Sequence, residues 1–277
     1  MGRVETRMYK RRQHRARVFR GIVLLLLLLA AILLAVFRMP RGFISELIAA
    51  PTPTPLTSAY DQTVESREVT LAEETWYAIQ TGVFSTREAA VQKAEAYTRR
   101  GAPGTVVEDG AKWRVFIACY GAEAEAASVR TRLSQSQGVD TYLYPWKCPE
   151  LRMRLTGKKG QLDVVEAGFT LLITTASTLR DTATSLDAAQ LTNPEAKSAV
   201  TALDGQITLW EETVRSRFGK SVPALLKGMM TITANWDARC QRVQNAEDAT
   251  TLSAALKAEA MGLYDEIIAW RSALAAE

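Results

Sequence analysis

Histidine is almost absent from this 277-residue sequence, because His14, close to the N-terminus, is the only one. Imidazole is the usual base beside a Ser or Cys nucleophile and a common metal ligand, so the rest of the chain lacks the residue that most hydrolases and zinc sites use. The sequence also contains no G-x-S-x-G and no S-x-x-K motif. It therefore predicts a protein that is not an enzyme and that has no catalytic residues, no metal site and no cofactor.

Pairs of acidic residues are the remaining candidates for catalysis, because two carboxylates are enough for glycoside hydrolysis. The clearest pairs are Glu211-Glu212 and Asp265-Glu266. Both lie on otherwise polar faces of expected helices. We therefore interpret them as solvated surface charge.

Excess positive charge is confined to one end of the chain. The sequence has 34 Lys and Arg against 30 Asp and Glu, a net charge of +4. Residues 1–20 hold eight basic residues and one acidic residue, so the remainder carries a net charge of −3. Nucleic-acid-binding domains are usually strongly basic, and no nucleic-acid partner is predicted here.

An uncharged run of 17 residues, 21–37, lies between Arg20 and Arg38. At about 1.5 Å per residue, a helix of this length approaches the thickness of a bilayer core. Most basic residues precede the run, so the positive-inside rule places the basic tail, residues 1–20, in the cytoplasm. The sequence predicts a single-pass protein of the cell membrane, with residues 38–277 outside the cytoplasm.

A cleaved signal peptide is the alternative, since a basic segment followed by an apolar run describes both. The best candidate cleavage site, after the small residues Ala49-Ala50, is followed by Pro51, which is unfavourable directly after a cleavage site. We therefore prefer an uncleaved transmembrane anchor. Residues 38–74 are interpreted as a linker, since residues 51–55 alternate Pro and Thr and residues 56–74 are polar and acidic.

Residues 75–147 predict an α+β domain. The segments 75–85, 103–109, 112–120 and 140–146 have the apolar alternation of strands, and 86–100 and 122–137 are helical in pattern. The order βαββαβ favours a four-stranded antiparallel sheet with both helices on one face and the other face open.

Alternation along the strands assigns side chains to the two faces. Tyr77 and Ile79 are expected under the helices, as are Trp113, Val115 and Ile117. The opposite, helix-free face is expected to gather aromatic and polar side chains in one patch: Trp76, Gln80, Lys112, Arg114 and Phe116. Flat aromatic rings beside amide and guanidinium donors suit sugar rings, although a merely solvated sheet face is the alternative.

The motif Tyr77-Ala78-Ile79-Gln80-Thr81-Gly82-Val83-Phe84-Ser85, followed by Ala89-Ala90, resembles the opening V-Q-x-G-x-F-S…A of the SPOR (sporulation-related repeat) domain. The segment Trp113-Arg114-Val115, the helix after it and the last strand resemble the second half of that family. The resemblance covers residues 75–147, about a quarter of the chain.

This resemblance implies binding to peptidoglycan glycan strands without stem peptides, by single-pass membrane proteins that gather at division or sporulation septa. It also implies that Gln80, Arg114 and Leu143 contact the glycan from the helix-free face, although parity alone leaves Leu143 and Tyr142 as alternatives. The chain departs from the family pattern at Val83 and at residues 118–120. The first change affects a sugar contact, and the second affects the bend before the second helix.

The sequence pattern over residues 148–277 predicts a separate helical domain. Leu151, Met153 and Leu155 indicate a short strand or extended connector. Apolar spacings of three and four then indicate four helices, separated at Asn193-Pro194, Gly219 and Asp248, with the third helix over residues 222–243. Short loops favour an antiparallel four-helix bundle.

The bundle's partner cannot be identified from its composition, because residues 150–277 carry 14 basic and 16 acidic groups. The leading hypothesis is a membrane-anchored cell-wall-binding protein, in which the bundle docks a possible protein partner. The alternative is a protein–protein adaptor of the division or sporulation apparatus whose α/β module no longer binds sugar.

Overall fold

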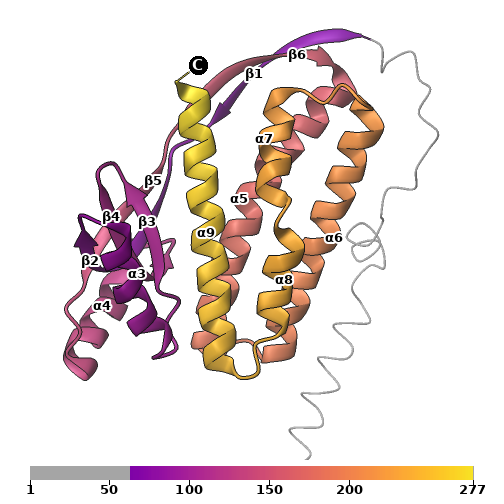
Figure 1. Cartoon of the computed structure of the whole chain (residues 1–277). Coiled ribbons are helices and arrows are strands. Elements are labelled where there is room, and N and C mark those ends of the chain that lie inside the picture. Colours follow the sequence, from indigo (N-terminus) through magenta and orange to yellow (C-terminus); the bar gives the residue numbers. More distant parts are fainter. Residues whose placement is uncertain (1–62, 277) are drawn as a thin grey trace, which may run out of the picture. The chain divides into compact units, whose positions relative to one another are not determined.

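The computed structural model of the protein describes residues 63–276 (Figure 1). The predicted basic tail, the predicted transmembrane helix over residues 21–37 and most of the predicted linker lie outside the described residues. Thirteen elements follow one another within the described range: β1 (Val64–Leu71), β2 (Glu74–Phe84), α3 (Arg87–Thr98), β3 (Thr105–Asp109), β4 (Lys112–Tyr120), α4 (Glu123–Gln137), β5 (Tyr142–Cys148), β6 (Leu151–Lys158), α5 (Lys159–Asp187), α6 (Asn193–Phe218), α7 (Ala224–Thr233), α8 (Trp236–Gln244) and α9 (Ala249–Ala275).

The predicted antiparallel sheet of four strands is confirmed. Its order is β3-β4-β2-β5, so the two inner strands β2 and β4 are neighbours, as the topology requires. The register of β2 and β4 shifts on both sides of Gln80. Gly110 has a φ of +61°, which allows the tight turn between β3 and β4.

Helices α3 and α4 cover one face of this sheet. The side chain of Thr86 caps α3 by accepting a hydrogen bond from the amide of Ala89 at 3.3 Å. Beneath the helices, the side chains of Ile79, Val115 and Ile117 are buried. The alternation in the sequence therefore assigned these side chains to the correct face.

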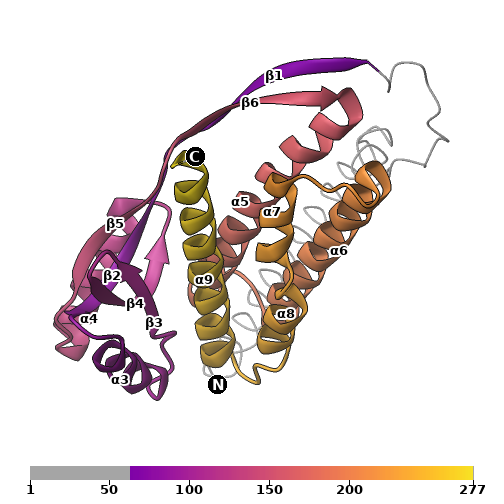
Figure 2. The same cartoon turned by 45° about the horizontal axis from the view of Figure 1, so that its top comes forward.

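A second, two-stranded sheet extends the first one. Residues 64–71, interpreted from sequence as linker, form β1, and they pair antiparallel with β6 from Val64↔Lys158 to Leu71↔Leu151. The alternation at residues 151–155 does correspond to a strand. In Figures 1 and 2, β1 and β6 run side by side from the four-stranded sheet over the helices.

Five helices, α5–α9, follow the sheets among the described residues, where the sequence predicted four. The predicted third helix is divided into α7 and α8 between Thr233 and Trp236. The hydroxyl of Thr233 donates to Glu211 Oε1 at 2.6 Å and lies 3.2 Å from the carbonyl oxygen of Met230. The hydrogen bond to Glu211 ties the end of α7 to α6 at this break.

Helix α5 is, by length and apolar composition alone, the one described helix that could span a membrane. Its buried residues belong to the main core, where Phe169, Leu172 and Leu179 pack with residues of α6, α7 and α9. The central helix of a packed bundle has this composition as well.

Two glycines within helices lead to opposite stability predictions. A Cβ at Gly168 of α5 would lie 2.6 Å from Met229 Cε and 2.7 Å from Trp210 Cζ2, and the Trp210 indole is held by a hydrogen bond to the carbonyl of Val164. Gly168→Ala should lower the free energy of unfolding by roughly 1–3 kcal/mol. Gly205 is an exposed position of α6, and a Cβ there would have no atom within 4 Å. Gly205→Ala should therefore raise the free energy of unfolding by about 0.5–1 kcal/mol. Urea unfolding of both variants measures this, and equal effects would contradict the close packing at Gly168.

Candidate functional site

Gln80 and Arg114, the two central residues of the predicted patch, are in direct contact. They lie on the neighbouring strands β2 and β4, and Arg114 Nη1 donates to Gln80 Oε1 at 2.7 Å. Arg114 Nε also donates to Asp109 Oδ2 at 2.6 Å, so that Arg114 forms an ion pair with the last residue of β3. The guanidinium is thus fixed in position while a fifth of its side chain stays exposed.

Two tyrosines on β5 complete this part of the face. The guanidinium of Arg114 lies over the ring of Tyr144 at 4.3 Å, and the Tyr144 hydroxyl donates to Asp109 Oδ2 at 3.3 Å. Burial, together with the nearby Asp109 carboxylate, raises the pKa of Tyr144. Tyr142 stands opposite Gln80 and is 64% exposed. We call the group Gln80, Asp109, Arg114, Tyr142 and Tyr144 the open end of the face.

Leu143 is not part of this group. It pairs with Ile79 in the register of β2 and β5, and it packs with the core under α3 and α4. Partners that stand directly opposite in a ladder share a face, so Leu143 points to the helices and Tyr142 to the helix-free side. Lys112, at the start of β4 opposite Asp109, is exposed.

The remaining members of the predicted patch, Trp76 and Phe116, are fully buried. The ring of Trp76 stacks on the ring of Tyr264 from α9, with centroids 3.9 Å apart and an interplanar angle of 0°. The Tyr264 hydroxyl donates to the carbonyl oxygens of Glu74 and Trp146, at 2.9 and 3.2 Å. The expectation of an open sheet face is therefore wrong for this half, because α9 lies against it (Figures 1 and 2).

We call Trp76, Phe116 and Trp146 the covered half of the face. Helix α5 also contributes to the cover, since the guanidinium of Arg180 lies 4.5 Å from the ring centre of Trp76. The Trp76 indole donates to Glu74 Oε1 at 2.8 Å, so its polar atom is satisfied within the fold. The open end and the neighbouring Lys112 can be reached from solvent without moving a helix, although Gln80 itself is only 7% exposed.

The described residues contain no group of three or more His, Cys, Asp or Glu side chains that could hold a metal ion. The thiols are also poor nucleophiles at neutral pH. Burial raises the pKa of Cys119 to about 12 and that of Cys148 to about 11, so both stay protonated. The chemistry available at the open end is hydrogen bonding and stacking.

Asp265 on α9 is not the solvated surface acid that its sequence context indicated. Burial raises its pKa to about 6, from 3.8, and the nearby carboxylates of Glu266 and of Glu108 on β3 act in the same direction. Because the folded protein holds this proton more tightly than the unfolded chain, the stabilisation is complete below pH 3.8 and is lost as the pH rises through about 6.

We therefore expect the free energy of unfolding to fall by about 1 kcal/mol between pH 5 and pH 7.5 through this group. Asp265→Asn should remove that part of the pH dependence, because the amide does not ionise. Asp140→Asn, at an exposed position, is the matched control and should leave the dependence unchanged. Urea titrations at the two pH values measure the effect, and an unaltered dependence in Asp265→Asn would contradict the assignment.

Comparison with known proteins bears on the sheet domain. The model of one protein family, described as the SPOR domain, matches residues 73–145. No curated protein and no solved structure matches the chain. The matched segment begins immediately before β2 and ends within β5, so it contains every residue of the open end. Residues 73–145 of this chain are a SPOR domain.

Proposed function

We propose that the protein binds peptidoglycan glycan strands through the open end of its SPOR sheet. SPOR is a peptidoglycan-binding, division-associated domain and not a catalytic one, which supports a cell-wall-binding role. The observation that carries the proposal is the arrangement of Arg114 over Tyr144, beside the exposed ring of Tyr142, on the helix-free face of that domain.

The open end offers complementary contacts to a sugar chain. Tyrosine rings pack against the C–H faces of pyranose rings, while guanidinium and carboxylate groups bond sugar hydroxyls. Removal of a stem peptide exposes the lactyl carboxylate of the muramic acid residue. Arg114 and the exposed Lys112 are suitable partners for that anion, which supports a preference for strands without stem peptides.

The location of the protein is part of the same proposal. A cytoplasmic tail at residues 1–20, a membrane anchor at 21–37 and an extracytoplasmic SPOR domain would place the open end at the wall side of the cell membrane. Naked glycan strands occur where the wall is being split, so we propose enrichment at division or sporulation septa.

The second candidate function is a protein–protein adaptor without sugar binding. One observation favours it: Trp76 and Phe116, the two aromatic members of the predicted patch, are fully buried. A face used as domain core has less area for a glycan strand. The two functions differ in whether binding to sacculi depends on the open end.

The experiment is a pull-down of the full-length protein in detergent with purified peptidoglycan sacculi, intact or treated with an amidase that removes stem peptides. We expect retention to rise after amidase treatment. Arg114→Ala and Tyr142→Ala should each lower retention roughly tenfold, because each removes one desolvated anchor of the sugar.

Arg154→Ala is the matched control. Arg154 is an exposed arginine on β6 that pairs with Glu68, away from the open end, so its loss should leave retention unchanged. Thermal unfolding of each variant shows whether the fold is kept. Retention that is absent on both materials, or equal in all variants, would reject the glycan proposal and favour the adaptor.

A further inference from the structure

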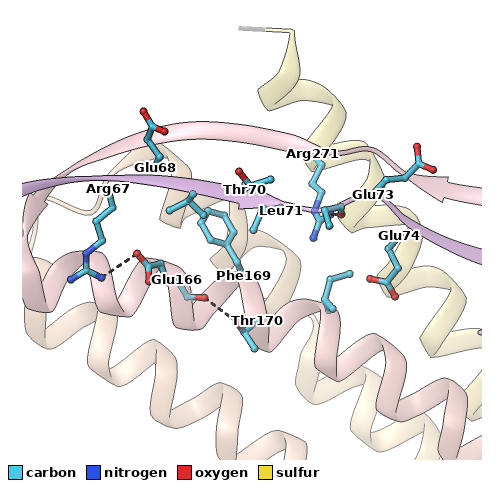
Figure 3. A pocket seen from close by; sticks show the side chains of 13 residues that line it. Arg67, Glu68, Thr70, Leu71, Glu73, Glu74, Glu166, Phe169, Thr170 and Arg271 are labelled. Carbon is cyan, nitrogen blue, oxygen red and sulfur yellow. Dashed lines mark hydrogen bonds and ion pairs between the residues drawn. The ribbon is translucent and has the colours of Figure 1, made fainter.

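A groove with a volume of about 950 Å³ lies between β1 and α5, outside the matched SPOR segment for most of its length. One wall is the strand segment 67–74, and the other is a stripe of α5 formed by Glu166, Phe169, Thr170 and Ile173. Figure 3 shows Arg67 at one end of the groove and Arg271, from α9, toward the other, with Phe169 and Leu71 between them. The volume is in the range typical of ligand sites.

The strand that borders the groove has an unpaired edge. Among residues 63–276, β1 pairs with β6 alone, and in Figure 3 β6 runs along the side of β1 that faces away from α5. In the adjoining sheet β2 has a second neighbour, β4, but β4 ends at Tyr120 opposite Tyr77. In a strand with one neighbour, every second residue points its backbone N–H and C=O away from that neighbour. On β1 these groups point toward the groove, and no other strand pairs with them.

The two arginines that line the groove differ in their carboxylate partners. Arg67 forms ion pairs with three carboxylates, those of Glu65, Asp163 and Glu166. Arg271 is only 4% exposed, and its Nη1 donates to the carbonyl oxygens of Ala72 and Pro149, at 3.2 and 3.5 Å, while its side chain also hydrogen-bonds the thiol of Cys148. Its Nε has no hydrogen-bond partner, and among residues 63–276 no carboxylate forms an ion pair with it.

A buried guanidinium without a counter-ion is unfavourable, and a carboxylate that satisfies it gains a charge-assisted hydrogen bond. The floor of the groove is apolar at Phe169, Ile173 and Leu71, which suits alternate side chains of an extended segment. Main-chain bonding to a strand edge with pockets for alternate side chains is a recurring mode of peptide recognition.

We propose that this groove binds an extended peptide of a partner protein, which adds a third strand to the free edge of β1 and places its C-terminal carboxylate at Arg271. The apolar side chains of the peptide lie on Phe169 and Leu71. The site is separate from the open end of the SPOR face, so the protein would hold the cell wall and a protein partner on different surfaces.

The test uses a synthetic array of extended peptides of about eight residues, with alternating apolar residues and a free C-terminal carboxylate, against the full-length protein in detergent. We expect a subset to bind and to slow amide hydrogen exchange in residues 64–71. The same sequences with a C-terminal amide should bind roughly tenfold more weakly, because the charge-assisted bond to Arg271 is lost.

Two variants on α5 localise the site. Thr170 is exposed and lines the groove, so Thr170→Arg should abolish binding by filling it. Thr174 is also exposed, one turn further along α5 and outside the lining of the groove, so Thr174→Arg should bind as the native protein does. Binding of no peptide, or equal binding by both variants, would overturn the proposal, and equal affinity for acids and amides would overturn the role of Arg271.

Discussion

The stack of Tyr264 on Trp76 is the contact on which the arrangement of this protein depends. It joins the last helix of the chain to the second strand, 188 residues earlier, and the Tyr264 hydroxyl satisfies two strand carbonyls at the same place. Burial of aromatic rings of this size contributes several kcal/mol in typical proteins. The sheet and the helices α5–α9 therefore share one hydrophobic core, and the SPOR segment is packed against its own chain.

This packing divides the helix-free face into a buried half and a solvent-accessible end. The covered half, around Trp76 and Phe116, stabilises the fold, whereas the open end keeps a fixed guanidinium and two tyrosine rings near solvent. The ion pair with Asp109 and the bond to Gln80 hold Arg114 in one geometry, so little conformational entropy remains to be lost on binding. Ala72 and Pro149 lie where the four-stranded sheet passes into the two-stranded sheet, and Arg271 donates to the carbonyl oxygens of both. The groove lies beside β1, beyond this point.

The local pattern of the sequence was sufficient for the SPOR sheet and its two faces. Alternation separates Trp76 from Tyr77, and Phe116 from Val115, correctly, because side chains in a strand point alternately to opposite faces. It was not sufficient for long-range contacts. The apolar stripe of α9 does not reveal that Tyr264 faces a sheet. Residues 64–71 are mostly polar and show no sustained apolar alternation, and they form a strand by pairing with the distant β6. Tyr142 was left as an alternative because its face depends on the register with β2.

Native-state hydrogen exchange of the full-length protein, followed along a denaturant series, tests the shared core most directly. If the stack of Tyr264 on Trp76 makes one cooperative unit, amides in the middle of β2, β4 and α9 should exchange through the same opening, with the same free energy and denaturant dependence. Exchange of the α9 amides at a much lower free energy than those of β2 would contradict this account, because it would make α9 a detachable cover over an otherwise complete ligand face.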